Sequence, residues 1–285
     1  MSQIFPIRSI RRAHVVAQAS LRGSLASVLS WTVAFVLAGC GSGSSTDPVS
    51  PSNVTRVSGV VAKGRVVDAT VCAYRIVNGV VSESLGRCSQ TDAAGGYQLQ
   101  LDASVDALIV EAKGGTYLDE ASGNRIALGV LRAVPTTPAS ETSYGRLFTA
   151  HVTPITDLIV RRAQAAGSID SVRISAAANE VIQYFKIGAS SIEPADLMTR
   201  GASSDFLSTC YGMYLAGISA LSSGSDLAAT LDSISRDIGN RTMAYRNPAF
   251  TDGLTRFLNS PLNLSGVSAS SINQCVGARP FTDPN

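Results

Sequence analysis

The sequence predicts an α+β protein in which short β-strands come first and amphipathic helices follow. From residue 57 to residue 152, short apolar and β-branched segments alternate with Gly, Asp and Pro, which is typical of an antiparallel β-sandwich. From Thr153 onwards, apolar residues recur every three or four positions, as they do on one face of a helix. We therefore expect a β-sandwich over residues 57–152 and an α-helical domain with a C-terminal tail over residues 153–285.

Two strong turn signals separate the expected strands. Asn78-Gly79 fits the two central positions of a type I′ turn, both of which need a positive φ angle. In residues 91–97, Asp92 can accept hydrogen bonds from the backbone that follows it, and glycine can adopt the left-handed conformation. The strands are expected at residues 57–61, 65–67, 70–76, 80–85, 97–101, 107–112, 126–134 and 147–152.

The helical part begins with a clear start signal. Thr153-Pro154 places a capping side chain before a proline at the first helical position. Apolar faces follow within residues 155–163, 174–185, 207–221 and 227–238, and a weaker helix is expected over residues 248–258. Four or five short amphipathic helices predict a small helical bundle.

The first 39 residues have the three parts of an export signal. Four arginines and no acidic residue accompany an apolar run over residues 24–36, which is shorter than the roughly 20 residues that a membrane-spanning helix needs. Leu37-Ala38-Gly39-Cys40 then resembles the lipobox of bacterial lipoproteins, in which a peptidase cleaves before the cysteine and the cysteine is acylated. We expect acyl chains on Cys40 to anchor the mature protein. An uncleaved anchor with an incidental cysteine is the alternative.

Residues 40–56 are expected to form a flexible tether, because Gly, Ser, Thr, Asp and Pro dominate them and leave almost nothing to bury. In lipoproteins of this class, an aspartate after the lipidated cysteine is associated with retention at the inner membrane. Gly41 stands there instead. The sequence therefore favours the outer membrane of a Gram-negative cell.

The charge balance argues against a nucleic-acid partner. The chain has 23 Lys and Arg against 21 Asp and Glu, and the 39-residue leader holds four of the arginines and none of the acids. The mature chain therefore has 19 basic and 21 acidic residues. Binding to nucleic acid would need a clustered basic surface.

Four cysteines remain after Cys40, an even number in an exported protein, where disulfides are stable. Three pairings are open, and proximity in the sequence favours Cys72 with Cys88 and Cys210 with Cys275. Free buried thiols are the alternative. A metal site is disfavoured because the sequence has no CxxC motif and no Cys/His cluster, and no cofactor is expected.

Three segments follow one another in the order of a known module. Residues 57–61 form a glycine-containing first strand, residues 68–74 follow the pattern of the second strand, and residues 91–97 match T-D-x-x-G-x-Y. Together they resemble a carboxypeptidase regulatory-like domain, and residues 113–120 and 152–156 resemble envelope lipoproteins that join this module to a helical region. The resemblance implies a transthyretin-like antiparallel β-sandwich that carries no active site.

The candidates for chemistry are few. His151 is the one histidine of the mature chain, and no G-x-S-x-G motif supplies a nucleophile, so we expect a hydrogen-bonded histidine at a strand end. Asp119-Glu120 together with Asp92 could form a Ca²⁺ site, but the DxDxDG spacing is absent, and solvated loop carboxylates are expected. The three tyrosines of the β region are expected to pack rather than to form an aromatic binding face; they are Tyr74, Tyr97 and Tyr117.

These observations predict a lipid-anchored envelope protein with a non-catalytic binding or structural role. Its expected partners are the membrane, through Cys40, and an envelope protein, a glycan or a peptidoglycan component. A hydrolase, or the accessory subunit of one, with a site between the sandwich and the bundle, is the alternative. It would need convergent titratable groups in a pocket.

Overall fold

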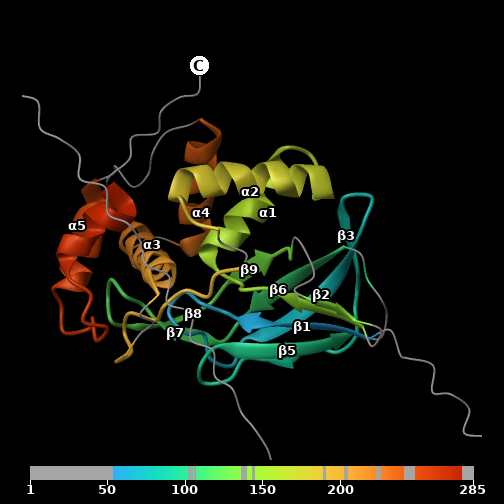
Figure 1. Cartoon of the computed structure of the whole chain (residues 1–285), viewed down its shortest axis with the longest axis horizontal. Helices are drawn as coiled ribbons and strands as arrows, with labels where there is room; N and C mark the ends of the chain where they lie inside the picture. The colour runs from blue at the N-terminus through green and yellow to red at the C-terminus, as the bar shows by residue number, and fades with distance from the viewer. Residues whose placement is uncertain are drawn as a thin grey trace, which may run out of the picture. The chain divides into compact units, whose positions relative to one another are not determined.

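The protein combines β-sheets with α-helices, which confirms the α+β class (Figure 1). This computed structural model describes residues 54–101, 105, 107–135, 140–142, 145–188, 191–201, 205–222, 226–240 and 248–277. The expected leader, the lipidation site Cys40 and most of the tether lie outside the described residues. All the described residues belong to one compact unit that spans Pro48–Asn285.

The first sheet has four strands in the order β10-β11-β1-β5. Its strands are β1 (Val54–Val60), β5 (Gly96–Leu101), β10 (Ser140–Thr142) and β11 (Gly145–Thr149). The expectation of purely antiparallel pairing is wrong here, because β1 and β11 pair in parallel. Parallel neighbours need a long connection, and the intervening chain from β2 to β10 provides it.

The second sheet has the order β3-β2-β6-β9, and β4 also pairs with β2. Its strands are β2 (Thr70–Val77), β3 (Val80–Ser84), β4 (Ser89–Gln90), β6 (Leu108–Lys113) and β9 (Val130–Ala133). Asn78 and Gly79 join β2 to β3 with φ angles of 51° and 75°. Both angles are positive, so the predicted type I′ conformation is confirmed at this turn.

A separate hairpin consists of β7 (Thr116–Leu118) and β8 (Arg125–Ala127). The single strand expected over residues 126–134 is wrong, because β8 pairs with β7 while β9 pairs with β6. Residues 65–67 were expected to form a strand and instead make only isolated bridges, at Arg65 with Ala62 and at Val67 with Thr116.

Five α-helices occur in the described part of the chain after the strands. They are α1 (Pro154–Ala165), α2 (Ser171–Phe185), α3 (Phe206–Ser222), α4 (Leu227–Gly239) and α5 (Pro248–Leu258). The predicted start signal is confirmed, since the Thr153 hydroxyl accepts a hydrogen bond from Thr156 N and the Thr156 hydroxyl accepts one from Thr153 N. None of the helices in these ranges has both the length and the hydropathy that crossing a membrane requires.

The strands and helices share one hydrophobic core. Buried side chains of both larger sheets and of all five helices belong to the same cluster. In Figure 1, α1 lies between α2 and β9, and it contacts both. Arg132 of β9 donates to the fully buried Asp157 of α1 at 3.0 Å. This ion pair lies at the junction of sheet and helix.

Two disulfides close the chain on itself. Cys72 of β2 is bonded to Cys88, and Cys210 of α3 is bonded to Cys275 in the short helical turn η3 (Asn273–Gly277). These are the pairs that proximity in the sequence favours. The second bridge is accompanied by a hydrogen bond of 2.7 Å from the Tyr214 hydroxyl to the carbonyl oxygen of Cys275, so the C-terminal segment is held against α3.

Candidate functional site

The candidate site forms where the β7–β8 hairpin meets the end of α3 and the start of α4. Asp119 stabilises the turn of the hairpin, because its Oδ1 accepts hydrogen bonds from Ser122 N at 2.9 Å, Ser122 Oγ at 2.9 Å and Ala121 N at 3.2 Å. A short acidic side chain that accepts from the backbone two or three residues later is a common turn device. The carboxylate of Asp119 therefore already makes hydrogen bonds that hold this turn together.

Lys63 lies behind this turn and is completely buried. Its Nζ is 3.0 Å from Glu120 Oε2 and 3.5 Å from Asp119 Oδ2, and it lies 5.3 Å from the centre of the Tyr117 ring. The Ser219 hydroxyl of α3 accepts from Lys63 and donates to Glu120. We call these four polar residues, Lys63, Asp119, Glu120 and Ser219, the buried ionic cluster. It links three segments that are far apart in the sequence.

The expectation of solvated loop carboxylates is wrong for Asp119 and Glu120. Both are buried, since pairing with Lys63 offsets part of the free energy of removing them from water. Asp92 does belong to an exposed turn, where its Oδ1 accepts from Ala94 N and Gly96 N at 2.8 Å. The described ranges contain no group of three or more His, Cys, Asp or Glu side chains arranged to hold a metal ion.

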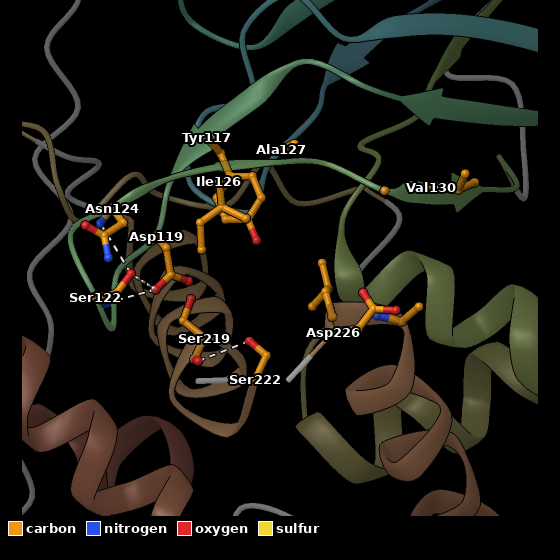
Figure 2. Close-up of a pocket in the computed structure, with 13 residues that line it drawn as sticks. Tyr117, Asp119, Ser122, Asn124, Ile126, Ala127, Val130, Ser219, Ser222 and Asp226 are labelled. Carbon is orange, nitrogen blue, oxygen red and sulfur yellow. Dashed lines mark hydrogen bonds between the residues drawn. The ribbon is translucent and has the colours of Figure 1, made fainter. Parts of the chain in front are cut away.

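A cavity of about 470 Å³ opens beside Asp119 and Ser219 of the ionic cluster (Figure 2). Its polar wall combines carboxylates, hydroxyls and an amide, and its apolar wall comes from β8, β9 and α4. The residues that line it are Tyr117, Asp119, Ser122, Asn124, Ile126, Ala127, Gly129, Val130, Ser219, Ser222, Asp226, Leu227 and Ala228. Pockets for small molecules have this size, with apolar walls and a few convergent polar groups.

Tyr117 is the most informative residue of the cavity. The side chain is buried, with 3% of the residue exposed, and its hydroxyl makes no hydrogen bond with any residue in the part of the chain that the structure describes. Figure 2 shows this hydroxyl pointing into the space between Asp119 and Ser219 on one side and Asp226 on the other. The oxygen of this hydroxyl is not sealed in the core but is reached from the cavity, so it can bond to a molecule there.

Burial and the neighbouring carboxylates both favour the neutral form of the Tyr117 phenol. Burial raises the pKa of Tyr117, and the carboxylates of Asp119, Glu120 and Asp226 raise it further, because each disfavours a phenolate. Asp226 is the N-cap of α4, where its Oδ1 accepts from Ala228 N at 3.2 Å. The neutral hydroxyl can both donate and accept a hydrogen bond.

His151 lies outside this cavity, and its expected hydrogen bond is absent. The residue is 6% exposed, and its Nδ1 atom is buried without a hydrogen-bond partner. Burial lowers the pKa of His151; Glu193 raises it and Arg65 lowers it. Arg65 and Glu193 form an ion pair of 3.0 Å that lines a second cavity of about 660 Å³. The structure does not bring His151 to Ser219, so no Ser-His pair forms there.

The tyrosines divide into two kinds. Tyr97 packs in the core and its hydroxyl donates to the carbonyl oxygen of Ala150, as expected of a packing residue. Tyr117 differs, because its hydroxyl faces the cavity. Neither Lys63 nor Ser219 was among the candidate residues from the sequence. Each interrupts an apolar stretch, Val60-Val61-Ala62 before Lys63 and Leu215-Ala216-Gly217-Ile218 before Ser219, and such an interruption is the signal that could have indicated them.

Comparisons with known proteins assign no family to the chain. No family model matches it, and no curated protein matches it. Among solved structures, it shares 14% identity with the major plantain pollen allergen Pla l 1, over 35% of this chain and 91% of the allergen, with a TM-score of 0.24. It shares 14% identity with the dioxygenase domain of a carbohydrate-binding fusion from Streptomyces sp. SirexAA-E, over 37% of this chain and 82% of that domain, with a TM-score of 0.23.

A 9R-lipoxygenase from Cyanothece PCC8801 is a further match, at 10% identity over 71% of this chain and 27% of the lipoxygenase, with a TM-score of 0.24. Similarities at this level assign neither a fold nor an activity to the chain.

Proposed function

We propose that this chain is a lipid-anchored protein of the outer membrane that binds a small ligand and does not convert it. The observation that carries the binding role is the Tyr117 hydroxyl, which faces a cavity of about 470 Å³ and makes no hydrogen bond with the residues that the structure describes. Water or another molecule in the cavity has to complete the hydrogen bonds of this hydroxyl. A ligand of the cavity would do so. We propose that this ligand is a glycan, a peptide or another peptidoglycan component of the envelope.

The proposed anchor rests on the leader and on Cys40. The two disulfides support an oxidising compartment. Two sheets followed by helices support our proposal that residues 57–152 form a transthyretin-like sandwich and residues 153–285 a helical bundle. In this arrangement the lipid would hold the protein at the membrane surface and the cavity would face its ligand in the periplasm or at the cell surface.

The anchor is tested by the intact mass of the protein extracted from membranes, with and without reduction. We expect a mass that begins at Cys40, includes acyl chains, and rises by about four hydrogens when two disulfides are reduced. An unmodified chain that begins at Met1 would overturn the anchor. A mass that does not change on reduction would mean that the disulfides are not formed, and they would then no longer support an oxidising compartment.

Binding in the cavity is tested by calorimetric titration of the mature protein in detergent with three five-carbon probes. The probes are cadaverine, 1,5-pentanediol and glutarate, which have the same length and differ in charge. We expect at least one of them to bind saturably. If none binds, the cavity is not a binding site for small molecules and the proposed function is wrong.

A matched pair of glycine variants places the binding in the cavity. Gly129 lines the cavity, whereas Gly188 does not, and a Cβ at either position would meet no other atom within 4 Å. Gly129→Phe is expected to block binding without disturbing the fold, and Gly188→Phe is expected to leave binding unchanged. Equal binding by Gly129→Phe and the unaltered protein would place the probe elsewhere.

A hydrolase is the second candidate, because Ser219 lines the cavity and donates to the Glu120 carboxylate. In that role Glu120 would accept the proton of the Ser219 nucleophile. The same Glu120 oxygen also accepts from Lys63 at 3.0 Å, which favours a structural role. We expect the protein to hydrolyse p-nitrophenyl acetate no faster than its Ser219→Ala variant. Turnover that is lost in this variant would replace the binding role with catalysis.

A further inference from the structure

The charge of the cavity wall indicates the class of ligand. Among the described residues that line the cavity, Asp119 and Asp226 are carboxylates and none is a lysine, an arginine or a histidine. Behind the wall, Lys63 is completely buried and is paired with both Asp119 and Glu120. Among the described residues in and behind this wall, there are therefore three carboxylates, those of Asp119, Glu120 and Asp226, and one ammonium group, that of Lys63. A cavity with this balance attracts cations and repels anions.

Two groups on the wall are positioned to receive a cation. The Tyr117 hydroxyl makes no hydrogen bond with the residues in the described ranges and points into the cavity. Asp226 faces it from the start of α4 (Figure 2). The Asp119 carboxylate is less available, because its Oδ1 already accepts three hydrogen bonds and its Oδ2 lies 3.5 Å from Lys63. An N–H donor between Tyr117 and Asp226 would satisfy both.

The other wall of the cavity is aliphatic. Ile126 and Val130 are 38% and 45% exposed, which is high for side chains of this type, and Leu227 of α4 also lines the cavity. Apolar surface on a ligand would cover these side chains and gain free energy by leaving water. The two walls together fit a molecule with a charged end and an aliphatic body.

We propose that the cavity binds a small molecule that carries an alkylammonium group. The ammonium group lies between the Tyr117 hydroxyl and the Asp226 carboxylate, and the aliphatic body covers Ile126 and Val130. This inference rests on the proposed function and specifies its ligand class. A Lys side chain of a peptide has the same chemistry as a free amine, so the inference concerns that shared group.

The three probes distinguish this inference from the proposed function on which it rests. Cadaverine is expected to bind at least tenfold more tightly than 1,5-pentanediol, because a hydrogen bond to a charged group contributes more than a neutral one. Glutarate is expected not to bind. If pentanediol or glutarate binds as tightly as cadaverine, the ligand class is wrong and the binding role stands. If no probe binds, the binding role itself fails.

Two conservative variants locate the ammonium group. Tyr117→Phe removes only the hydroxyl and is expected to weaken cadaverine binding about tenfold, while Tyr97→Phe, which removes a buried hydroxyl elsewhere, is expected to leave it unchanged. Asp226→Asn keeps a capping side chain on α4 and is expected to weaken cadaverine about fivefold, as the loss of one partly exposed ion pair does. Neither variant should weaken pentanediol more than cadaverine. Unchanged cadaverine binding by both variants would overturn the proposal.

A last titration separates the two sources of the ammonium group. Nα-acetyl-lysine methylamide represents a lysine within a peptide, and cadaverine represents a free amine of similar length. Tighter binding of the former assigns a peptide segment as the natural source, and tighter binding of the latter assigns a small amine. Both outcomes support an alkylammonium ligand, and failure of both overturns it.

Discussion

Lys63 shows how one buried charge can hold distant segments together. It follows β1 in the sequence, pairs with Glu120 at the β7–β8 turn and contacts Ser219 on α3. Moving such a lysine out of water is unfavourable, and only close partners offset that free energy. The buried ionic cluster is therefore a strict constraint on how the hairpin sits against α3.

Replacing Lys63 with methionine should destabilise the protein strongly. Met has a similar length but leaves Glu120 buried without its cationic partner, which typically costs about 3–5 kcal/mol. Urea unfolding measures the free energy of unfolding. The double variant Lys63→Met/Glu120→Gln should lose less than Lys63→Met alone, because no unpaired charge then remains at position 120. A loss below about 1 kcal/mol for the single variant would show that the cluster is not formed.

His151 should make the stability of the protein depend on pH. Burial lowers its pKa in the folded state below the ordinary value of 6.5, so the unfolded chain binds the proton more tightly. Its contribution to the free energy of unfolding is therefore complete above about pH 6.5 and is lost as the pH falls from there toward the lowered pKa. One such group changes the free energy by at most about 1.4 kcal/mol per pH unit.

His151→Leu removes the titrating group and the buried Nδ1 atom together. We expect the free energy of unfolding of this variant to change less between pH 7 and pH 5 than that of the unaltered protein, as measured by urea unfolding across the range. Equal slopes in the two proteins would contradict this account, because the carboxylates contribute in the same way to both.

At the scale of elements, the two disulfides constrain segments of different length. The bridge from Cys72 to Cys88 spans a sequence separation of 16, and the bridge from Cys210 to Cys275 spans 65. Longer loops lose more conformational freedom when they are closed, so the second bridge should contribute more to stability. It also fixes α3, whose Ser219 lines the cavity.

Removing each bridge by a pair of alanines tests this order. Cys72→Ala/Cys88→Ala should lower the free energy of unfolding by about 3 kcal/mol and Cys210→Ala/Cys275→Ala by about 4 kcal/mol, according to the loop-entropy relation. Chemical denaturation of the two variants measures the difference, and the reduced unaltered protein serves as the control for losing both. A larger loss for the shorter loop would mean that strain or residual structure decides the effect.

Local signals explain which elements the sequence could predict. The Asn78-Gly79 turn and the Thr153-Pro154 start are decided by a few adjacent residues, and both formed as expected. Residues 126–134 are different, because whether they form one strand or two depends on the partners β7 and β6, which lie elsewhere in the sequence. Pairing partners are a tertiary property that a local pattern does not contain.

The candidate site was hidden for the same reason. Lys63, Glu120 and Ser219 come from three segments, and each reads alone as a loop or helix residue. Asp119-Glu120 was visible as a pair of acids, but its burial depends on a lysine that lies more than fifty residues earlier. The composition of the sequence therefore indicated the polar atoms and could not indicate their partners.

At the scale of the whole molecule, the β and α parts share one core. Arg132 of β9 pairs with Asp157 of α1, and Lys63 contacts Ser219 of α3. The hydrophobic cluster is continuous from the sheets to the helices. Interactions that cross the boundary at residue 153 should couple the unfolding of both parts.

We therefore expect one cooperative unfolding transition, although the sequence divides the chain at residue 153. Hydrogen–deuterium exchange at increasing urea concentration, read out by mass spectrometry, reports on peptides from β6 and from α3 separately. Both should lose protection at the same urea midpoint. Two clearly separated midpoints would instead show that the sandwich and the helical domain unfold independently.

The bridge between Cys210 and Cys275 has a consequence for biosynthesis. Cys275 leaves the ribosome 65 residues after its partner Cys210. A product truncated before Cys275 would keep an unpaired thiol at Cys210 on α3. That thiol would be open to disulfide exchange, so the second bridge distinguishes molecules that extend at least to Cys275 from shorter ones.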